Sequence, residues 1–323
     1  MWVIESPPER RRVDGYRLDI QSDAAVSFID RHKDEPFFLY LAYYAPHVPL
    51  EAPPKYLNRF PQDMPTRRRY ALAMMAAMDD GVGRIRERLK EHGILENTMF
   101  WFISDNGAPL KIHKQDLPIS HRGGGWNGSL NTPMRGEKGM LSEGGIRVPF
   151  DVGVTAMAVA GEGIPSDFDG VNLMPNLRGE AGGDPHEALF WRFWNQTAVR
   201  KGDWKFLKFG DKREMLFHLG RDPEETNDVI NDHPEIAANL KRELRAWADE
   251  LRIPGVPNGG LNAQERPWLE HYFDLETGAA TTRPKGPARP AWVARHAGMN
   301  RTPDGLRLAD FGPKAPRAFH DCQ

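Results

Sequence analysis

Two uninterrupted apolar runs, separated by a long helical pattern, constrain the fold of this chain most strongly. Residues 37–43 and 98–103 have the length and the flanking residues of strands buried on both faces. Between them, residues 66–91 carry apolar side chains at helical spacing, and Gly93 gives a stop signal. The order strand, loop, helix, strand predicts an α/β fold with a parallel sheet. Ligands of such sheets bind beyond the carboxyl ends of the strands.

The C-terminal part changes character. Four short runs with tight turns predict antiparallel strands, at residues 187–193, 197–200, 204–209 and 215–219. Asp232-His-Pro-Glu235 resembles a capping box and predicts a helix that continues to Leu251. A short amphipathic helix is also expected near residues 22–32.

We therefore divide the chain into three parts. Residues 1–180 form an incomplete α/β domain, and residues 186–252 form a small antiparallel-sheet subdomain with one helix. Residues 253–323 are rich in Pro, Gly, Arg and Ala, and we expect an irregular or disordered tail there. Within that tail, Trp268, Tyr272 and Phe273 are the side chains expected to dock.

Composition excludes several classes of protein. The formal charge of −2 gives no basic field that would point to nucleic acid. The single cysteine, Cys322, allows neither an intrachain disulfide nor a cysteine metal site. No window of about 20 apolar residues exists, so we expect no membrane contact. The first residues lack a signal-peptide pattern, and we expect the chain to begin within a domain.

Three short motifs carry candidate chemistry. Asp105 and Asn106 follow the second apolar run and offer hard oxygen ligands for a divalent cation, although Asp-Asn-Gly is also a common turn. Lys138 lies in a glycine-rich segment and can reach a bound oxyanion as a point charge, or can be a solvated charge. His47 lies in Ala45-Pro-His-Val-Pro49, where it can protonate a leaving group or be incidental to a rigid loop.

The long polar segment of residues 107–145 is functional or disordered by its length. Trp126 and Asn127 are candidates for stacking on and hydrogen-bonding to a sugar ring, or else for covering the edge of the sheet. Both roles stay open at this point. His113 and His121 are expected to be solvated.

Taken together, these motifs resemble the sulfatase family of the alkaline-phosphatase-like superfamily. The resemblance runs from about Tyr16 to Leu251, and its densest part is Arg135-Gly-Glu-Lys138 followed by Glu143-Gly-Gly-Ile-Arg147-Val-Pro149. It implies an alkaline-phosphatase-like, mostly parallel sheet flanked by helices, incomplete here, plus a small C-terminal antiparallel sheet with one helix.

The resemblance also implies roles for individual residues. Asp105 and Asn106 complete a Ca²⁺ site that two further aspartates begin. Lys138 contacts the sulfate and helps the leaving oxygen depart, and His47 is an active-site histidine. Arg147 is expected to brace the loop by hydrogen bonds.

The implied activity is hydrolysis of sulfate esters of a carbohydrate or an aryl alcohol, in a periplasmic or extracellular protein. The family nucleophile lies in a Cys/Ser-x-Pro-x-Arg motif and becomes formylglycine. We expect this motif to be absent, since the only cysteine stands in His320-Asp-Cys-Gln323 with no Pro or Arg after it. We also expect the family's N-terminal third to be missing. A truncated chain of this kind is predicted to be inactive alone.

Two alternatives remain. One is a phosphate or phosphonate ester hydrolase of the same superfamily, which parallel assays on aryl sulfate and aryl phosphate would distinguish. The other is a non-catalytic protein that binds sulfated glycans, which an absent nucleophile would favour.

Overall fold

The computed structural model describes residues 2–4, 10–112, 119, 126–146, 148, 150–251, 265–274, 301–302 and 305–306. The chain divides into two units, Met1–Thr277 and Gly278–Gln323. In the second unit, β7 (Arg301–Thr302) pairs with β8 (Gly305–Leu306). All the predicted sites lie in the first unit, which begins with an antiparallel hairpin of β1 (Trp2–Ile4) and β2 (Arg10–Arg12).

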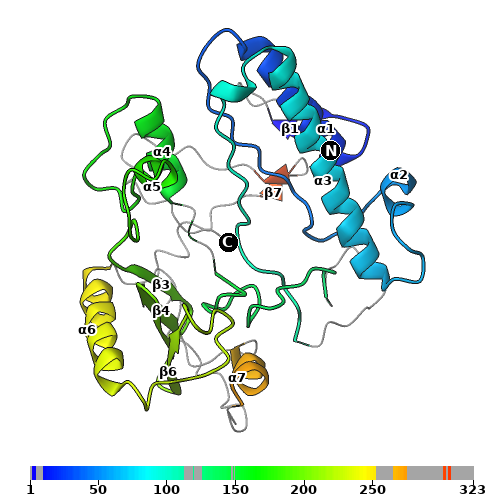
Figure 1. Cartoon of the computed structure of the whole chain (residues 1–323). Coiled ribbons are helices and arrows are strands. Elements are labelled where there is room, and N and C mark those ends of the chain that lie inside the picture. The colour runs from blue at the N-terminus through cyan, green and yellow to red at the C-terminus, as the bar shows by residue number, and fades with distance from the viewer. Residues whose placement is uncertain are drawn as a thin grey trace. The chain divides into compact units, whose positions relative to one another are not determined.

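Two long helices, α1 (Arg17–His32) and α3 (Thr66–Glu91), pack side by side (Figure 1). The predicted bounds of the second are confirmed, and the first begins five residues before the expected start. Each buries small and aliphatic side chains at helical spacing against the other, among them Ala25, Ile29, Ile85 and Leu89. The short helices α2 (Pro54–Leu57) and η1 (Leu95–Asn97) flank this pair.

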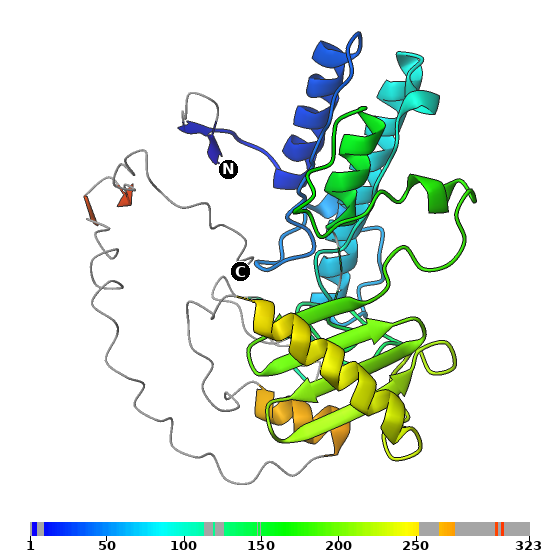
Figure 2. The same ribbon diagram turned by 90° about the vertical axis from the view of Figure 1, so that its left-hand side faces the viewer.

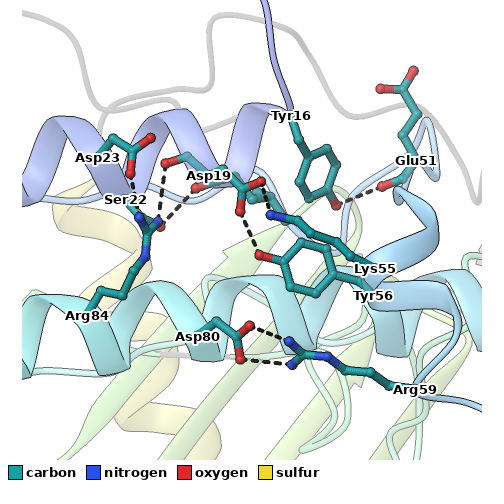
Figure 3. Close-up of polar contacts among 11 residues, drawn as sticks. Tyr16, Asp19, Ser22, Asp23, Glu51, Lys55, Tyr56, Arg59, Asp80 and Arg84 are labelled. Atoms are coloured by element: carbon teal, nitrogen blue, oxygen red, sulfur yellow. Dashed lines mark hydrogen bonds and ion pairs between the residues drawn. The ribbon is translucent and has the colours of Figure 1, made fainter.

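A polar network ties α1, α2 and α3 together (Figure 3). The Asp19 carboxylate accepts hydrogen bonds from Lys55 Nζ at 2.7 Å and from Tyr56 Oη at 2.6 Å. Arg59 donates two parallel hydrogen bonds to Asp80, at 2.9 Å and 2.6 Å. Fork-shaped pairing of this kind fixes orientation as well as distance. The network therefore sets the position of α2 and of the chain that leads into it.

The two apolar runs predicted as parallel strands are not strands in the part of the chain that the structure describes. Residues 37–43 are extended without ladder pairing, and so are residues 98–103. Phe37, Leu39 and Leu41 alternate inward and pack against the α1–α3 pair. The intervening Phe38 and Tyr40 are 65% and 81% exposed. The alternating exposure over residues 37–41 is that of extended backbone, as predicted. The predicted pairing with a neighbouring strand is not found among the described residues.

The predicted antiparallel sheet is confirmed. Its strands are β3 (Leu189–Phe193), β4 (Gln196–Lys201), β5 (Trp204–Phe209) and β6 (Arg213–His218), in the order β3-β4-β5-β6. Helix α6 (Pro234–Glu250) lies across one face (Figure 2) and contacts alternate strand residues such as Val199, Phe206 and Leu216. The predicted capping box does not form, because His233 is the N-cap and makes no side-chain cap bond.

The other face of this sheet packs on α7 (Glu265–Phe273), a helix in the segment that was expected to be irregular. Trp268 and Phe273 are buried there, which confirms that they dock. Two further helices, α4 (Asp151–Val159) and α5 (Met174–Leu177), precede the sheet. Among the described helices, none has the length and apolarity needed to cross a membrane.

Candidate functional site

The Asp105-Asn106 turn lies at the end of the second extended run. The backbone N–H of Asn106 donates to Asp105 Oδ1 at 2.9 Å, and the Asn106 amide donates to Asp105 Oδ2 at 2.5 Å. Ser104 Oγ donates to the Asn106 carbonyl at 2.8 Å. These are short-range hydrogen bonds within one turn. They leave the Asp105 side chain exposed, with its carboxylate at the surface.

Close backbone contacts join this turn to the Lys138 segment. The N–H of Lys138 donates to the Ala108 carbonyl at 3.1 Å, and the N–H of Gly107 donates to the Gly145 carbonyl at 3.2 Å. A Cβ atom on Gly107 would lie 1.6 Å from the Gly144 carbonyl oxygen, so no side chain fits there. The structure therefore brings the backbone segments of Asp105, Asn106 and Lys138 together. That their side chains share one site stays a prediction.

Two polar side chains hold these segments in place: the half-buried Asn131, which the sequence offered as a sugar contact, and the buried Glu137, which it did not single out. Asn131 accepts the Ala108 N–H at 2.7 Å and donates to the carbonyls of Ala108 and Gly136 at 3.1 Å and 2.9 Å. Glu137 is 2% exposed and accepts three N–H groups, from Lys111, Ile112 and the Trp268 indole. A carboxylate with this many donors is satisfied without a cation.

The small sheet supplies two further contacts to the same loop. Gln196, fully buried in β4, accepts the Leu141 N–H at 3.0 Å and donates to the Gly139 carbonyl at 2.8 Å. Lys205, fully buried in β5, pairs with Glu143 at 2.6 Å. A signal for Lys205 was present in the sequence, because it shares the two-residue period of Leu207 and Phe209, which point into the core.

His47 lies in the segment between α1 and α2. Its Nδ1–H donates to the Val48 carbonyl at 2.6 Å, so Nε2 is the acceptor of the neutral ring. The centroid of the imidazole lies 5.6 Å from that of the Tyr44 ring, and the Arg17 guanidinium lies over the same Tyr44 ring at 4.3 Å. The histidine is exposed. That His47 meets Lys138 at one substrate stays a prediction.

Trp126 and Asn127 are buried, at 6% and 7% exposure. The indole N–H donates to the Ser129 carbonyl at 2.5 Å, and the Asn127 carbonyl oxygen accepts the Ser129 N–H at 3.0 Å. These bonds support the loop, and a contact with a sugar stays a prediction. Arg147, His113 and His121 lie outside the described residues.

Within the part of the chain that the structure describes, no three His, Cys, Asp or Glu side chains gather where they could hold a metal ion. Asp105 and Asn106 have the oxygen chemistry that a divalent cation takes. Calcium sites use about six to eight oxygens, so this pair fits in kind and falls short in number.

Comparison with known proteins gives the family. The family model described as Sulfatase matches residues 5–151. "Uncharacterized sulfatase YdeN" of Escherichia coli (strain K12) is 38% identical, over 76% of this chain and 53% of the relative. The chain belongs to the sulfatase family. "N-acetylgalactosamine-6-O-sulfatase" of Bacteroides thetaiotaomicron is 27% identical to this sulfatase-family chain, over 71% of it and 50% of the relative.

A solved structure confirms the fold class. "Crystal structure of Ps i-CgsB in complex with k-i-k-neocarrahexaose" superposes with a TM-score of 0.66 and 28% identity, over 81% of this chain and 60% of that one. Its family fold is α/β and alkaline-phosphatase-like. The chain spans about half the length of the curated relatives it matches.

The expectation about the nucleophile motif needs a correction. The sequence contains Ser6-Pro7-Pro8-Glu9-Arg10, which has the Ser-x-Pro-x-Arg spacing. The prediction that the motif is absent is therefore wrong. The cysteine form does not occur, but the serine form does. Residues 5–9 lie between β1 and β2 and outside the described residues, so a role for Ser6 is a matter for experiment.

Proposed function

We propose that this sulfatase-family chain provides the cation and leaving-group side of a sulfate ester hydrolase. The observation that carries the proposal is the pair of backbone hydrogen bonds, Lys138 N–H to Ala108 and Gly107 N–H to Gly145, at 3.1 Å and 3.2 Å. They hold a lysine segment beside a carboxylate–amide pair. An ammonium and a cation site next to each other suit a substrate that carries an oxyanion.

Each candidate residue then has a chemical task. Lys138 neutralises the sulfate and the charge that develops on the leaving oxygen. His47 can donate a proton to that oxygen when its ring is protonated, since its Nδ1–H is already engaged by Val48. Asp105 and Asn106 would hold a divalent cation, which would act there as a Lewis acid. Arg147 would brace the loop.

The substrate that fits best is a sulfated glycan. One similar structure carries a neocarrahexaose in its title, and one relative is named for a sulfate on N-acetylgalactosamine. Trp126 and Asn127 are the proposed sugar contacts. The family resemblance favours a periplasmic or extracellular location.

We further propose that residues 1–323 alone do not turn over sulfate esters. Two cation ligands and a second Lys and His pair of the family pattern have no counterpart in the motifs of this chain. Ser6 has the motif spacing but would lack those partners. Loss of an activated nucleophile costs several orders of magnitude in rate.

The test joins residues 1–323 to the part of YdeN that they do not align with, and YdeN itself is assayed beside the joined protein. The joined protein is assayed in parallel on an aryl sulfate and an aryl phosphate. Sulfate turnover that disappears in Lys138→Ala is the expected result. Phosphate turnover alone would favour a phosphate or phosphonate ester hydrolase. Binding of a sulfated oligosaccharide without any turnover would favour a glycan-binding protein.

A further inference from the structure

Lys205, the second residue of β5, is a lysine with no exposure to solvent. Burial of an ammonium is costly unless charged partners and hydrogen bonds compensate. Two carboxylates do so here. Glu143 Oε1 lies 2.6 Å from the Lys205 Nζ and Glu225 Oε1 lies 2.8 Å from it. The three side chains form a triad between the small sheet and the glycine-rich loop, in which Lys205 and Glu225 are fully buried and Glu143 is 24% exposed.

The Glu225 end of the triad is anchored firmly. Glu225 is fully buried and adopts a left-handed backbone with φ of 57°. Its N–H donates to the Asp222 carbonyl at 3.1 Å, and the Asp222 carboxylate accepts the N–H groups of Thr226 and Asn227 at 3.0 Å and 2.8 Å. Burial raises the pKa of Glu225, and Lys205 acts in the opposite direction.

The Glu143 end reaches the candidate site through the backbone. Glu225 Oε2 accepts the N–H of Glu143 at 2.7 Å, so both the backbone and the side chain of Glu143 are held. The next two residues meet the site directly, since the Gly144 oxygen lies against Gly107 and the Gly145 carbonyl accepts the Gly107 N–H. A shift of Glu143 would therefore move the Asp105–Asn106 turn.

We propose that Lys205 is a positioning residue for the sulfate ester site, acting through Glu143 to hold the Lys138 loop against the Asp105–Asn106 turn. This inference rests on the proposed function, because that proposal identifies the sulfate ester site. The contacts described above carry the positioning role. Replacing a whole buried ion triad by neutral groups is commonly tolerated, whereas removal of one member leaves a buried charge unpaired. The triad therefore fixes an arrangement more than it supplies net stability.

The first test is made on the full chain without substrate. The triple variant Lys205→Met, Glu143→Gln, Glu225→Gln removes the triad and leaves no unpaired buried charge. Selective ¹⁵N-glycine labelling reports Gly107, Gly144 and Gly145 in the loop, with Gly202 and Gly210 in the turns of the small sheet as references. We expect amide exchange at the three loop glycines to accelerate at least tenfold, with the two references unchanged.

A second triad on the same sheet gives a matched control. Lys201 Nζ lies 2.9 Å from Glu187 and 3.0 Å from Glu243, on the side that faces α6. Its neutral variant, Lys201→Met, Glu187→Gln, Glu243→Gln, has the same charge change and should leave the loop glycines unaffected. Equal acceleration in both variants would overturn the proposal. Loss of the whole sheet in the Lys205 variant would also overturn it, because the triad would then hold the sheet and not the loop.

The second test uses the joined enzyme. There the triple variant of Lys205, Glu143 and Glu225 should misplace Lys138. We expect kcat to fall at least tenfold and KM to change less, because the lysine acts on the leaving group. An unchanged kcat with a looser loop would refute the link to catalysis. If the unsubstituted joined enzyme is inactive on sulfate esters, the proposed function fails, while the glycine spectra still decide whether Lys205 positions the loop.

Discussion

Gly107 stands where the backbone of two loops comes closer than a side chain permits. Its missing Cβ would lie 1.6 Å from the Gly144 oxygen. We expect Gly107→Ala to lower the free energy of unfolding by about 2 to 3 kcal/mol, since the clashing atoms belong to backbone that is hydrogen-bonded on both sides. Chemical denaturation measures the change.

The matched control for that substitution is Gly83, an exposed glycine in α3 with no atom within 4 Å of an added Cβ. Gly83→Ala should stabilise the chain by about 0.5 to 1 kcal/mol through helix propensity. Equal effects of the two substitutions would contradict the close approach of Gly107 to Gly144.

Asp105 and Asn106 give a prediction for cation binding. They supply two side-chain ligand groups, and calcium sites use about six to eight oxygens. We expect calcium to bind the isolated chain no more tightly than about 10⁻³ M, and Asp105→Asn to remove the binding that is seen. Calorimetry that found tight, stoichiometric binding would show that other ligands complete the site.

At the scale of helices and strands, the sequence predicted best where a partner lies nearby in the chain. Helix α3 and the strands β3 to β6 were predicted closely, because periodicity and tight turns are local signals. The runs at 37–43 and 98–103 were predicted as paired strands, and pairing depends on segments that local pattern does not identify. The same reason hid the contacts of Glu137 and Lys205, whose most distant partners are 131 and 62 residues away in the sequence.

The helix network gives a prediction for the pH dependence of stability. The hydrogen bonds from Arg59 lower the pKa of Asp80, and burial opposes this. For Asp19, burial raises the pKa, but Lys55 and Tyr56 more than compensate, so the pKa is lowered. A lowered carboxyl pKa gives stability that is present above the unfolded value near about 4 and is lost as the pH falls through the folded value.

We therefore expect the urea concentration at the unfolding midpoint of the helical part to decrease as the pH is lowered below about 4. The decrease should be smaller in Asp80→Asn. Circular dichroism during urea titration at pH 7 and in the acid range measures it. Asp211→Asn, at a fully exposed turn residue, is the control and should leave the acid dependence unchanged. An acid dependence identical in Asp80→Asn and the unsubstituted chain would contradict the assignment.

For the molecule as a whole, the exposed apolar side chains of the extended runs matter most. Phe38 and Phe102 are 65% and 77% exposed, on backbone that pairs with no strand among the residues that the structure describes. Such segments associate edge to edge. We expect the isolated chain to self-associate, and Phe38→Ser with Phe102→Ser to reduce light scattering without lowering Tm. Leu39→Ser, which faces the helices, should instead lower Tm. Scattering that the double substitution leaves unchanged would contradict this.

The most direct measurement is aryl sulfate turnover by a monodisperse sample of residues 1–323, produced together with a formylglycine-generating enzyme. We infer that this chain carries the leaving-group and cation side of the chemistry without a working nucleophile. We therefore expect no turnover above that of Lys138→Ala. Turnover that is present in the unsubstituted chain and disappears in Lys138→Ala would contradict it, and loss in Ser6→Ala as well would identify Ser6 as the nucleophile.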